Sequence, residues 1–194
     1  MQLVLRGTGR EVTVGLERPV VMIGERINPT GRERLAEELL AGDLTRVRRE
    51  AVAQAEAGAE VIDVNVGVAG VDEVKLLSRA VEAVAEAVEV PLCIDSANPQ
   101  ALEAALMLCP GKPLVNSVNG GQESLAAILP LVARRGAAVI GLTMSGARVP
   151  GEVEERFRLA KLIVEEARAE GIPPEDVLID CLAIAVATEP QAGR

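Results

Sequence analysis

The sequence predicts an α/β fold, a TIM-type (β/α) barrel in which short strands alternate with amphipathic helices. Six short runs of largely β-branched residues end in polar residues, and segments rich in Ala, Leu, Glu and Arg with helical spacing lie between them. This alternation is typical of βα units whose strands pair in parallel. At 194 residues, 49% of them hydrophobic, the chain is long enough to bury the core of one domain.

The elements follow one another in a regular order. The strands are predicted at residues 20–23, 61–66, 92–95, 114–117, 138–142 and 177–179. The helices are predicted at residues 32–40, 45–57, 72–88, 99–108, 124–135 and 152–170. Asn98 before Pro99 is an expected N-cap followed by proline at the first helical position, and Gly58, Gly136 and Gly171 stand where helices should end.

An N-terminal β-hairpin is expected before the first parallel strand. Two apolar segments, residues 3–5 and 12–14, flank a Gly-rich turn at residues 6–10. We expect residues 1–18 to plug the bottom of the barrel and residues 19–194 to form the βα units of a single domain, 1–194. A closed barrel of this type has eight strands and typically about 250 residues. The barrel is therefore expected to be incomplete, with about six of eight βα units and a truncated C-terminal side.

The composition excludes several classes of protein. No apolar run approaches the ~20 residues of a membrane span, and the start lacks a signal-peptide pattern, so we expect a cytoplasmic protein. Three widely spaced cysteines suggest neither a disulfide framework nor a zinc site. The net charge of -9 and the single aromatic residue, Phe157, argue against nucleic-acid binding. Because histidine is absent, we expect no metal site, and any catalysis must use carboxylates, amides, hydroxyls or a bound cofactor.

Polar side chains collect where the predicted strands end. In a parallel barrel the ligand sits at the C-terminal ends of the strands. The residues at these ends are mostly acids and amides: Glu25, Arg26, Asn28, Asp63, Asn65, Asp95, Ser96, Asn116, Ser117, Asn119 and Asp180.

Acids and amides of this kind fit the edge of a flat heterocycle such as a pterin, which alternates N–H donors with acceptors. A carboxylate accepts two parallel hydrogen bonds from a 2-amino group and the neighbouring ring N–H, and Asp95 is the first candidate for this role, with Asp180 second. The alternative is that such residues cap helices or close turns. Asn28 and Asn119 are expected to be turn residues.

Four ordered motifs resemble those of the pterin-binding methyltransferases, which include methyltetrahydrofolate:corrinoid methyltransferase and the folate domain of cobalamin-dependent methionine synthase. The motifs are Ile23-Gly24-Glu25-Arg26-Ile27-Asn28, Ile62-Asp63-Val64-Asn65-Val66-Gly67, Cys93-Ile94-Asp95-Ser96 and Val115-Asn116-Ser117. The resemblance continues through Ile179-Asp180-Cys181.

The resemblance implies a set of site residues. Asp95 and Asn116 would bind the pterin and act in catalysis, and Asp180 would help to hold the ring. Asn65 and Glu25 are weaker members of the set. Asp63 and Ser96, from the same motifs, complete the expected pterin-binding residues.

The activity implied by the resemblance is binding of methyltetrahydrofolate and transfer of its N5-methyl group to the cobalt(I) of a corrinoid. The corrinoid (cobalamin) would be carried by a partner protein or by a cobalamin-binding domain. A homodimer, or a complementing C-terminal segment, is also expected.

The sequence departs from the family in two places. Residues 145–148 do not follow the family's Asn/Asp-containing loop, and the seventh-strand asparagine that contacts N5 of the pterin has no counterpart here. Two alternatives therefore stay open. One is a dihydropteroate synthase-like enzyme, which expels pyrophosphate and so needs cations, although Arg26 is the only basic residue in a strand-end motif. The other is a non-catalytic pterin-binding barrel fragment.

Overall fold

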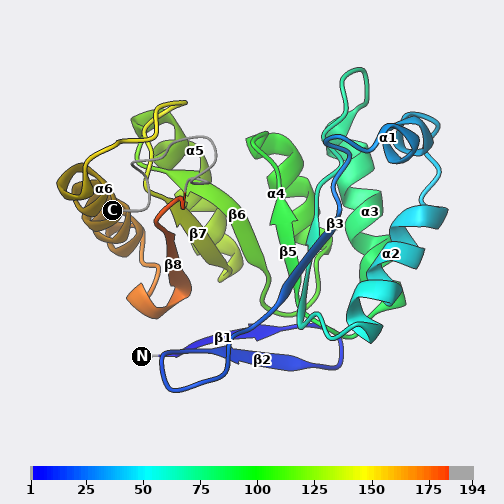
Figure 1. Cartoon of the computed structure of the whole chain (residues 1–194), viewed down its shortest axis with the longest axis horizontal. Helices are drawn as coiled ribbons and strands as arrows, with labels where there is room; N and C mark the ends of the chain where they lie inside the picture. Colours follow the sequence, from blue (N-terminus) through cyan, green and yellow to red (C-terminus); the bar gives the residue numbers. More distant parts are fainter. Residues whose placement is uncertain (1, 184–194) are drawn as a thin grey trace.

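Six parallel strands form one curved sheet, in which each strand lies beside its neighbour in the sequence (Figure 1). The structure is a computed structural model that describes residues 2–183. The parallel strands are β3 (Ile23–Ile27), β4 (Val61–Val64), β5 (Leu92–Asp95), β6 (Leu114–Asn119), β7 (Ala138–Leu142) and β8 (Val177–Asp180). The predicted parallel α/β architecture is confirmed.

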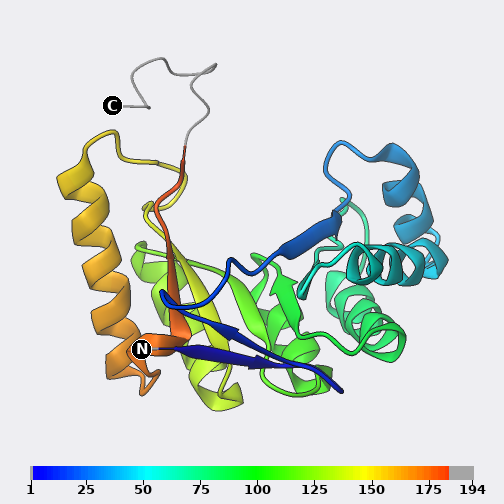
Figure 2. The same ribbon diagram turned by 60° about the horizontal axis from the view of Figure 1, so that its bottom comes forward.

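Helices connect the strands and cover the outer face of the sheet (Figures 1 and 2). They are α1 (Glu33–Leu40), α2 (Thr45–Glu56), α3 (Glu73–Ala87), α4 (Pro99–Leu108), α5 (Gln122–Arg135) and α6 (Val153–Ala169), with a short 3-10 helix, η1, at Pro174–Asp176. The expected N-cap of α4 is present, because Asn98 accepts hydrogen bonds from the backbone N–H groups of Gln100 and Ala101. Gly136 ends α5 in the left-handed conformation, as predicted.

The helices bury the outer face of the sheet, and the hairpin buries the lower part of its inner face. On the outer face, side chains such as Ile62, Ile94 and Val115 pack against the helices in the main core. On the inner face, Cys93 and Leu114 belong to a second cluster that includes the N-terminal hairpin. Residues within one strand alternate between these two clusters, which is the two-residue period of a pleated strand.

The N-terminal hairpin consists of β1 (Leu3–Arg6) and β2 (Glu11–Val14), which pair antiparallel. It lies across the bottom of the sheet (Figure 2). Leu3, Leu5 and Val12 are buried there against residues that open the parallel strands: Val61, Cys93, Leu114 and Ala138. The predicted hairpin is therefore confirmed, and it covers the N-terminal ends of the strands.

The first parallel strand begins three residues later than predicted. Val20 and Met22 are 95% and 58% exposed and precede the strand, whereas Glu25 and Arg26 lie within it. The prediction followed the apolar run at residues 20–23. The strand starts later because its pairing with β4 begins only where Ile23 aligns with Val61.

The sheet does not close into a barrel within the described part of the chain. Among residues 2–183, β3 and β8 each pair with one strand only, and Figure 1 shows them standing apart at the two sides of the sheet. The structure thus bears out the predicted six parallel strands, of which β8 is the last element described. No helix in residues 2–183 has both the length and the apolar character needed to cross a membrane.

Candidate functional site

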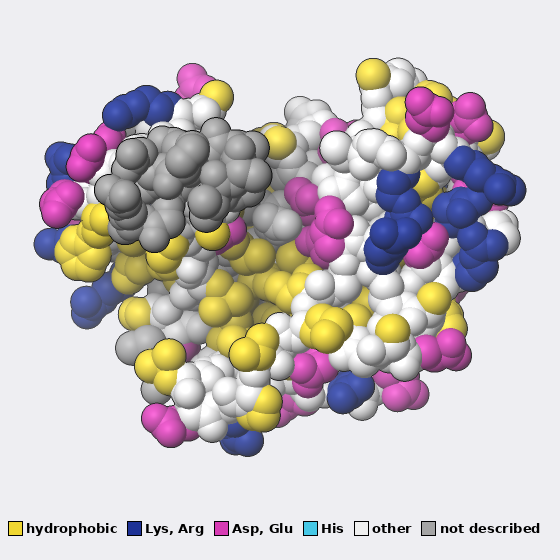
Figure 3. All heavy atoms as spheres, viewed as in Figure 1, with side chains coloured by type: hydrophobic (Ala, Val, Ile, Leu, Met, Phe, Trp, Pro, Cys, Tyr) yellow, Lys and Arg dark blue, Asp and Glu magenta, His cyan; other side chains and the backbone are white. Residues whose placement is uncertain are grey.

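Two hollows lie at opposite ends of the sheet. The larger, of about 820 Å³, is bounded by the hairpin and the starts of the strands and is lined mainly by aliphatic side chains. Figure 3 shows apolar side chains deep in the hollow centre of the molecule. The smaller, of about 510 Å³, opens at the C-terminal ends of the strands beside Asp95 and Asn116. The smaller hollow is lined by the acids and amides of the strand ends, so we place the candidate site there.

Asp63 and Asn116 form the deepest polar pair of the site. Asp63 lies on β4 and is 2% exposed, and its Oδ1 accepts a hydrogen bond from Nδ2 of Asn116 on β6 at 3.2 Å. This bond fixes the orientation of the Asn116 amide, so that its oxygen and its second N–H face away from Asp63. Asn116 therefore enters the site as a side chain with a defined donor and acceptor.

The Asp63 carboxyl is unusual because its Oδ2 is buried without a hydrogen-bond partner in the described residues. Burial is the main reason that the pKa of Asp63 rises from 3.8 to about 6, and the nearby charges of Asp95 and Glu25 add to the rise. Hydrogen bonds from Cys93 and Asn116 oppose it. A buried carboxyl with a raised pKa is characteristic of functional sites.

Asn65 and Asp95 form a second amide–carboxylate pair. Asn65 Nδ2 donates to Asp95 Oδ2 at 2.8 Å, and Asn65 Oδ1 accepts from the Gly67 N–H, also at 2.8 Å. Both ends of the amide are thus fixed. Burial raises the pKa of Asp95 above its ordinary value, and the hydrogen bond from Asn65 offsets part of that rise. Oδ1 of Asp95 is left for a ligand donor in the pocket that Asp95 lines.

Glu25 reaches the same region from β3. Its charge adds to the rise in the pKa values of both Asp63 and Asp95. Glu25 Oε1 accepts from Asn28 Nδ2 at 2.5 Å. Asn28 also accepts from the Thr30 N–H, so its predicted role as a turn residue is confirmed.

Ser96 is buried at the start of the turn after β5. Its hydroxyl donates to Glu73 Oε1 at 2.5 Å and accepts from the Asn98 N–H at 3.0 Å. These bonds tie the β5–α4 turn to the first residue of α3. Asn119 likewise closes a turn, since its Oδ1 accepts from the Gly121 N–H at 2.8 Å, as predicted.

Asp180 stands apart from the other predicted residues. It ends the edge strand β8, is exposed, and its Oδ1 accepts from the Leu182 N–H at 2.7 Å. Strand β7 separates β8 from Asn116 on β6. The structure therefore brings together Glu25, Asp63, Asn65, Asp95 and Asn116, with Ser96 behind them, and leaves Asp180 at the rim.

Two side chains that support the site were not predicted from the sequence. Glu73 holds Ser96, and Gln54 on α2 accepts from the backbone N–H of Arg26 at 2.6 Å. Gln54 is 8% exposed and lies on the buried face of α2 with Val47 and Ala51. A polar residue at a buried helical position was the signal that could have found it.

The fold is a parallel α/β sheet with acids and amides at its strand ends, and the chain belongs to the family described as "Pterin binding enzyme", whose family model matches residues 24–192. The chain is 38% identical over 175 residues to a methylcorrinoid:tetrahydrofolate methyltransferase of Eubacterium limosum, covering 88% of this chain. It is 30% identical over 184 residues to a methionine synthase of Mycobacterium leprae, covering 90% of this chain. The chain spans 63% of the first relative and 15% of the second.

Solved structures with the same fold include a dihydropteroate synthase of Xanthomonas albilineans. The TM-score is 0.66 at 25% identity, over 93% of this chain and 65% of that one. The predicted resemblance to the pterin-binding methyltransferases is confirmed by the family match and by the methyltransferase relatives.

Proposed function

We propose that the chain binds methyltetrahydrofolate at the C-terminal ends of its strands and moves the N5-methyl group to the cobalt(I) of a corrinoid. The observation that carries the proposal is the convergence of two fixed amide–carboxylate pairs, Asn65 with Asp95 and Asn116 with Asp63. The similarity to a methylcorrinoid:tetrahydrofolate methyltransferase supports the chemistry.

The donor and acceptor pattern suits the pterin edge. Oδ1 of Asp95 accepts from a pterin N–H, and the Asn65 bond to Oδ2 holds the carboxylate plane in place. The Asn116 amide, held by Asp63, offers one N–H and one oxygen to the same ring. The ring then lies in the pocket beside Ser96, Leu142 and Met144.

Transfer requires activation of N5, because a tertiary amine leaves poorly unless its nitrogen gains a proton or a strong hydrogen bond. The second N–H of Asn116 is the donor that we assign to this step, with Asp95 fixing the ring. The corrinoid is a substrate carried by another protein or domain, and its cobalt(I) supplies the electron pair of the new bond to the methyl group. The N5–methyl bond breaks, N5 keeps that bonding pair, and it takes up a proton from solvent to give tetrahydrofolate.

The direction of transfer is set by the supply of methyl donor. The name of the Eubacterium limosum relative describes the reverse reaction, from a methylcorrinoid to tetrahydrofolate. A catalyst lowers the barrier equally in both directions, so the same contacts serve either reaction.

The test combines binding with turnover. Methyltetrahydrofolate is titrated by calorimetry, and methyl transfer to reduced cobalamin is followed by its absorbance, each with the wild type and with Asp95→Asn. Specific binding and transfer, both reduced in the variant, support the proposal. Binding without transfer would identify a non-catalytic pterin-binding fragment, and absence of binding would refute the site.

A dihydropteroate synthase activity is the second candidate, because the similar solved structures include enzymes of that name. Expulsion of pyrophosphate requires cations or backbone N–H groups around an anion, and the strand-end motifs offer Arg26 alone. Incubation with a dihydropterin pyrophosphate and 4-aminobenzoic acid tests it. Formation of dihydropteroate would replace the methyltransferase proposal.

We further propose that two additional βα units pair with the open edges at β3 and β8. Each edge strand has one neighbour in the described residues, and the apolar hollow of about 820 Å³ lies beside them. The chain alone should form oligomers and bind hydrophobic dyes, because its sheet edges are open. Co-expression with a segment that supplies two βα units should make it monodisperse and raise its affinity for pterin. Sedimentation of the chain as a compact monomer whose behaviour does not change when the segment is added would contradict this proposal. A stable dimer would show that a second copy of the chain covers the open edges.

A further inference from the structure

Strand β3 contains a bulge next to the site. Gly24 pairs with Ile62 and Ile27 pairs with Val64, so two residues, Glu25 and Arg26, oppose the single residue Asp63. A bulge of this kind leaves the extra residue without a ladder partner and redirects the side chains around it.

The bulge decides which side chains of β3 face the helices. Gly24 and Ile27 both lie on the helix side, where Ile27 is fully buried in the main core and Gly24 lies against Gln54. In a regular strand the two-residue alternation would place Arg26 in the core and turn Ile27 toward the inner face. The bulge thus keeps the charged Arg26 side chain out of the core. Glu25 faces the inner side with or without the bulge, and what the bulge sets is the position of the backbone that carries Glu25 opposite Asp63.

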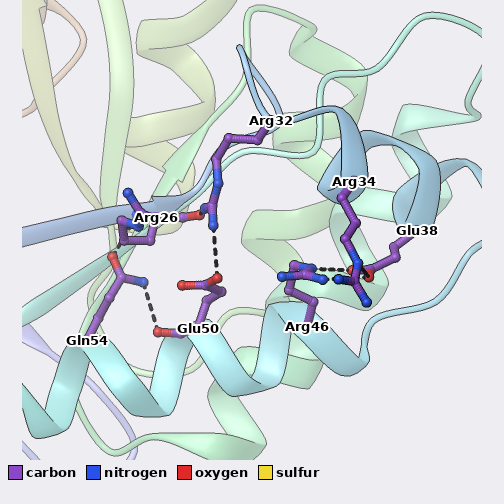
Figure 4. Close-up of polar contacts among 7 residues, drawn as sticks. All are labelled: Arg26, Arg32, Arg34, Glu38, Arg46, Glu50 and Gln54. Carbon is purple, nitrogen blue, oxygen red and sulfur yellow. Dashed lines mark hydrogen bonds and ion pairs between the residues drawn. The ribbon is translucent and has the colours of Figure 1, made fainter.

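Side chains from outside the sheet bond both backbone groups of Arg26 (Figure 4). Gln54 Oε1 accepts from the Arg26 N–H at 2.6 Å, and the Arg26 carbonyl accepts from Arg32 Nη1. Both supporting side chains are anchored at Glu50 on α2. Gln54 Nε2 donates to the Glu50 carbonyl at 3.1 Å, and Arg32 Nη2 pairs with Glu50 Oε1 at 2.9 Å.

Gly24 is the residue that lets Gln54 approach. A Cβ at this position would lie 2.7 Å from Gln54 Oε1 and 3.1 Å from the Ala59 Cβ. Only a residue without a side chain leaves the acceptor of Gln54 free to reach the bulge.

We propose that Gln54, together with Arg32 and Glu50, is a positioning residue that holds the β3 bulge and thereby fixes the stretch of backbone that carries Glu25 beside the pterin site. The proposal rests on the proposed function for its ligand, while the arrangement itself is a property of the free protein. Gln54 does not touch the ligand and acts through the backbone of Arg26.

The Asp63 carboxyl reports on the position of Glu25 without any ligand. Burial raises the pKa of Asp63 most, and the groups that face it are Cys93 and Asp95 on β5, Asn116 on β6 and Glu25 on β3. A carbon NMR titration of the Asp63 carboxyl should give a pKa of about 6 in the wild type and a lower value in Glu25→Gln. Gln54→Met, which keeps the length of the side chain but removes the amide, should lower it in the same direction.

The double variant decides whether Gln54 acts through Glu25. If it does, Glu25→Gln combined with Gln54→Met shifts the pKa no further than Glu25→Gln alone. Glu38→Gln is the matched control, because it breaks the Arg46 pair between α1 and α2 without touching β3, and it should leave the pKa of Asp63 unchanged (Figure 4). Arg32→Gln provides a milder second variant, should Gln54→Met fail to fold.

Titration with methyltetrahydrofolate separates the two proposals. Glu25→Gln and Gln54→Met should each raise Kd roughly fivefold, the effect of one hydrogen bond, and together no more than either alone. If the wild type binds no methyltetrahydrofolate, the proposed function fails, and the NMR titration still decides the role of Gln54. A wild-type pKa of Asp63 in folded Gln54→Met and Arg32→Gln, or additive shifts in the double variant, would overturn the positioning role.

Discussion

The two ends of the parallel sheet use opposite chemistry. At the N-terminal ends, Leu3, Leu5 and Val12 of the hairpin pack on apolar strand residues, and shape alone determines the contact. At the C-terminal ends, Asp63 and Asn116 are held by directed hydrogen bonds, and one carboxylate oxygen stays buried without a partner in the described residues. The first end stabilises the fold, whereas the second costs stability and carries the candidate site. This is the division expected of a parallel barrel.

The largest expected effect falls on the stabilising end. Leu5 is 1% exposed, so Leu5→Ala removes buried apolar volume and should lower the free energy of unfolding by about 2–5 kcal/mol. Chemical denaturation measures this. Leu16→Ala is the matched control, since Leu16 is fully exposed at 102%, and it should change stability little. Equal losses in both variants would show that the hairpin is not packed as described.

The protein should become more stable when the buried carboxyl of Asp63, at the polar end of the sheet, is made neutral. The folded-state pKa of Asp63, about 6, lies above its ordinary value of 3.8, so folding favours the protonated form and stability falls as pH rises through this window. The free energy of unfolding of Asp63→Asn should therefore exceed that of the wild type by roughly 3 kcal/mol above pH ~6.5. This difference should vanish below pH ~4. Thermal melts across pH measure the difference. A constant difference at all pH values would contradict the assignment.

Loss of the Asn116 amide should reduce turnover more than it reduces binding of the pterin. If its amide stabilises charge at N5 only in the transition state, Asn116→Ala should lower kcat by about 10²-fold in an active protein and change KM much less. Gln100→Ala removes an exposed amide of α4 that does not line the hollow and serves as the control. A change confined to KM would make Asn116 a simple binding residue.

Pterin affinity should distinguish the centre of the site from its rim. Asp95→Asn removes a charge-assisted bond and should weaken pterin binding by about 1.5–3 kcal/mol. Asp180→Asn should weaken it less, because Asp180 is exposed on the edge strand and already accepts from Leu182. Calorimetric titration of both variants tests the order, and a larger loss in Asp180→Asn would reverse it.

The sequence determined by itself the six parallel strands, their order and the hairpin. These features follow from local periodicity and end signals, such as the Asn98 cap and Gly136, which act within a few residues. The sequence also placed acids and amides at the strand ends, and the parallel topology brought Asp63, Asn65, Asp95 and Asn116 to one mouth.

Only the tertiary structure decided the register of β3, the amide orientations and the isolation of Asp180. The strand starts where Ile23 meets Val61, and the bulge beyond it depends on Gln54, which is distant in sequence. Likewise, the orientation of the Asn116 amide depends on Asp63, 53 residues away. Such contacts join residues that no local pattern relates, because hydrogen bonds between strands and helices exist only once the elements have packed.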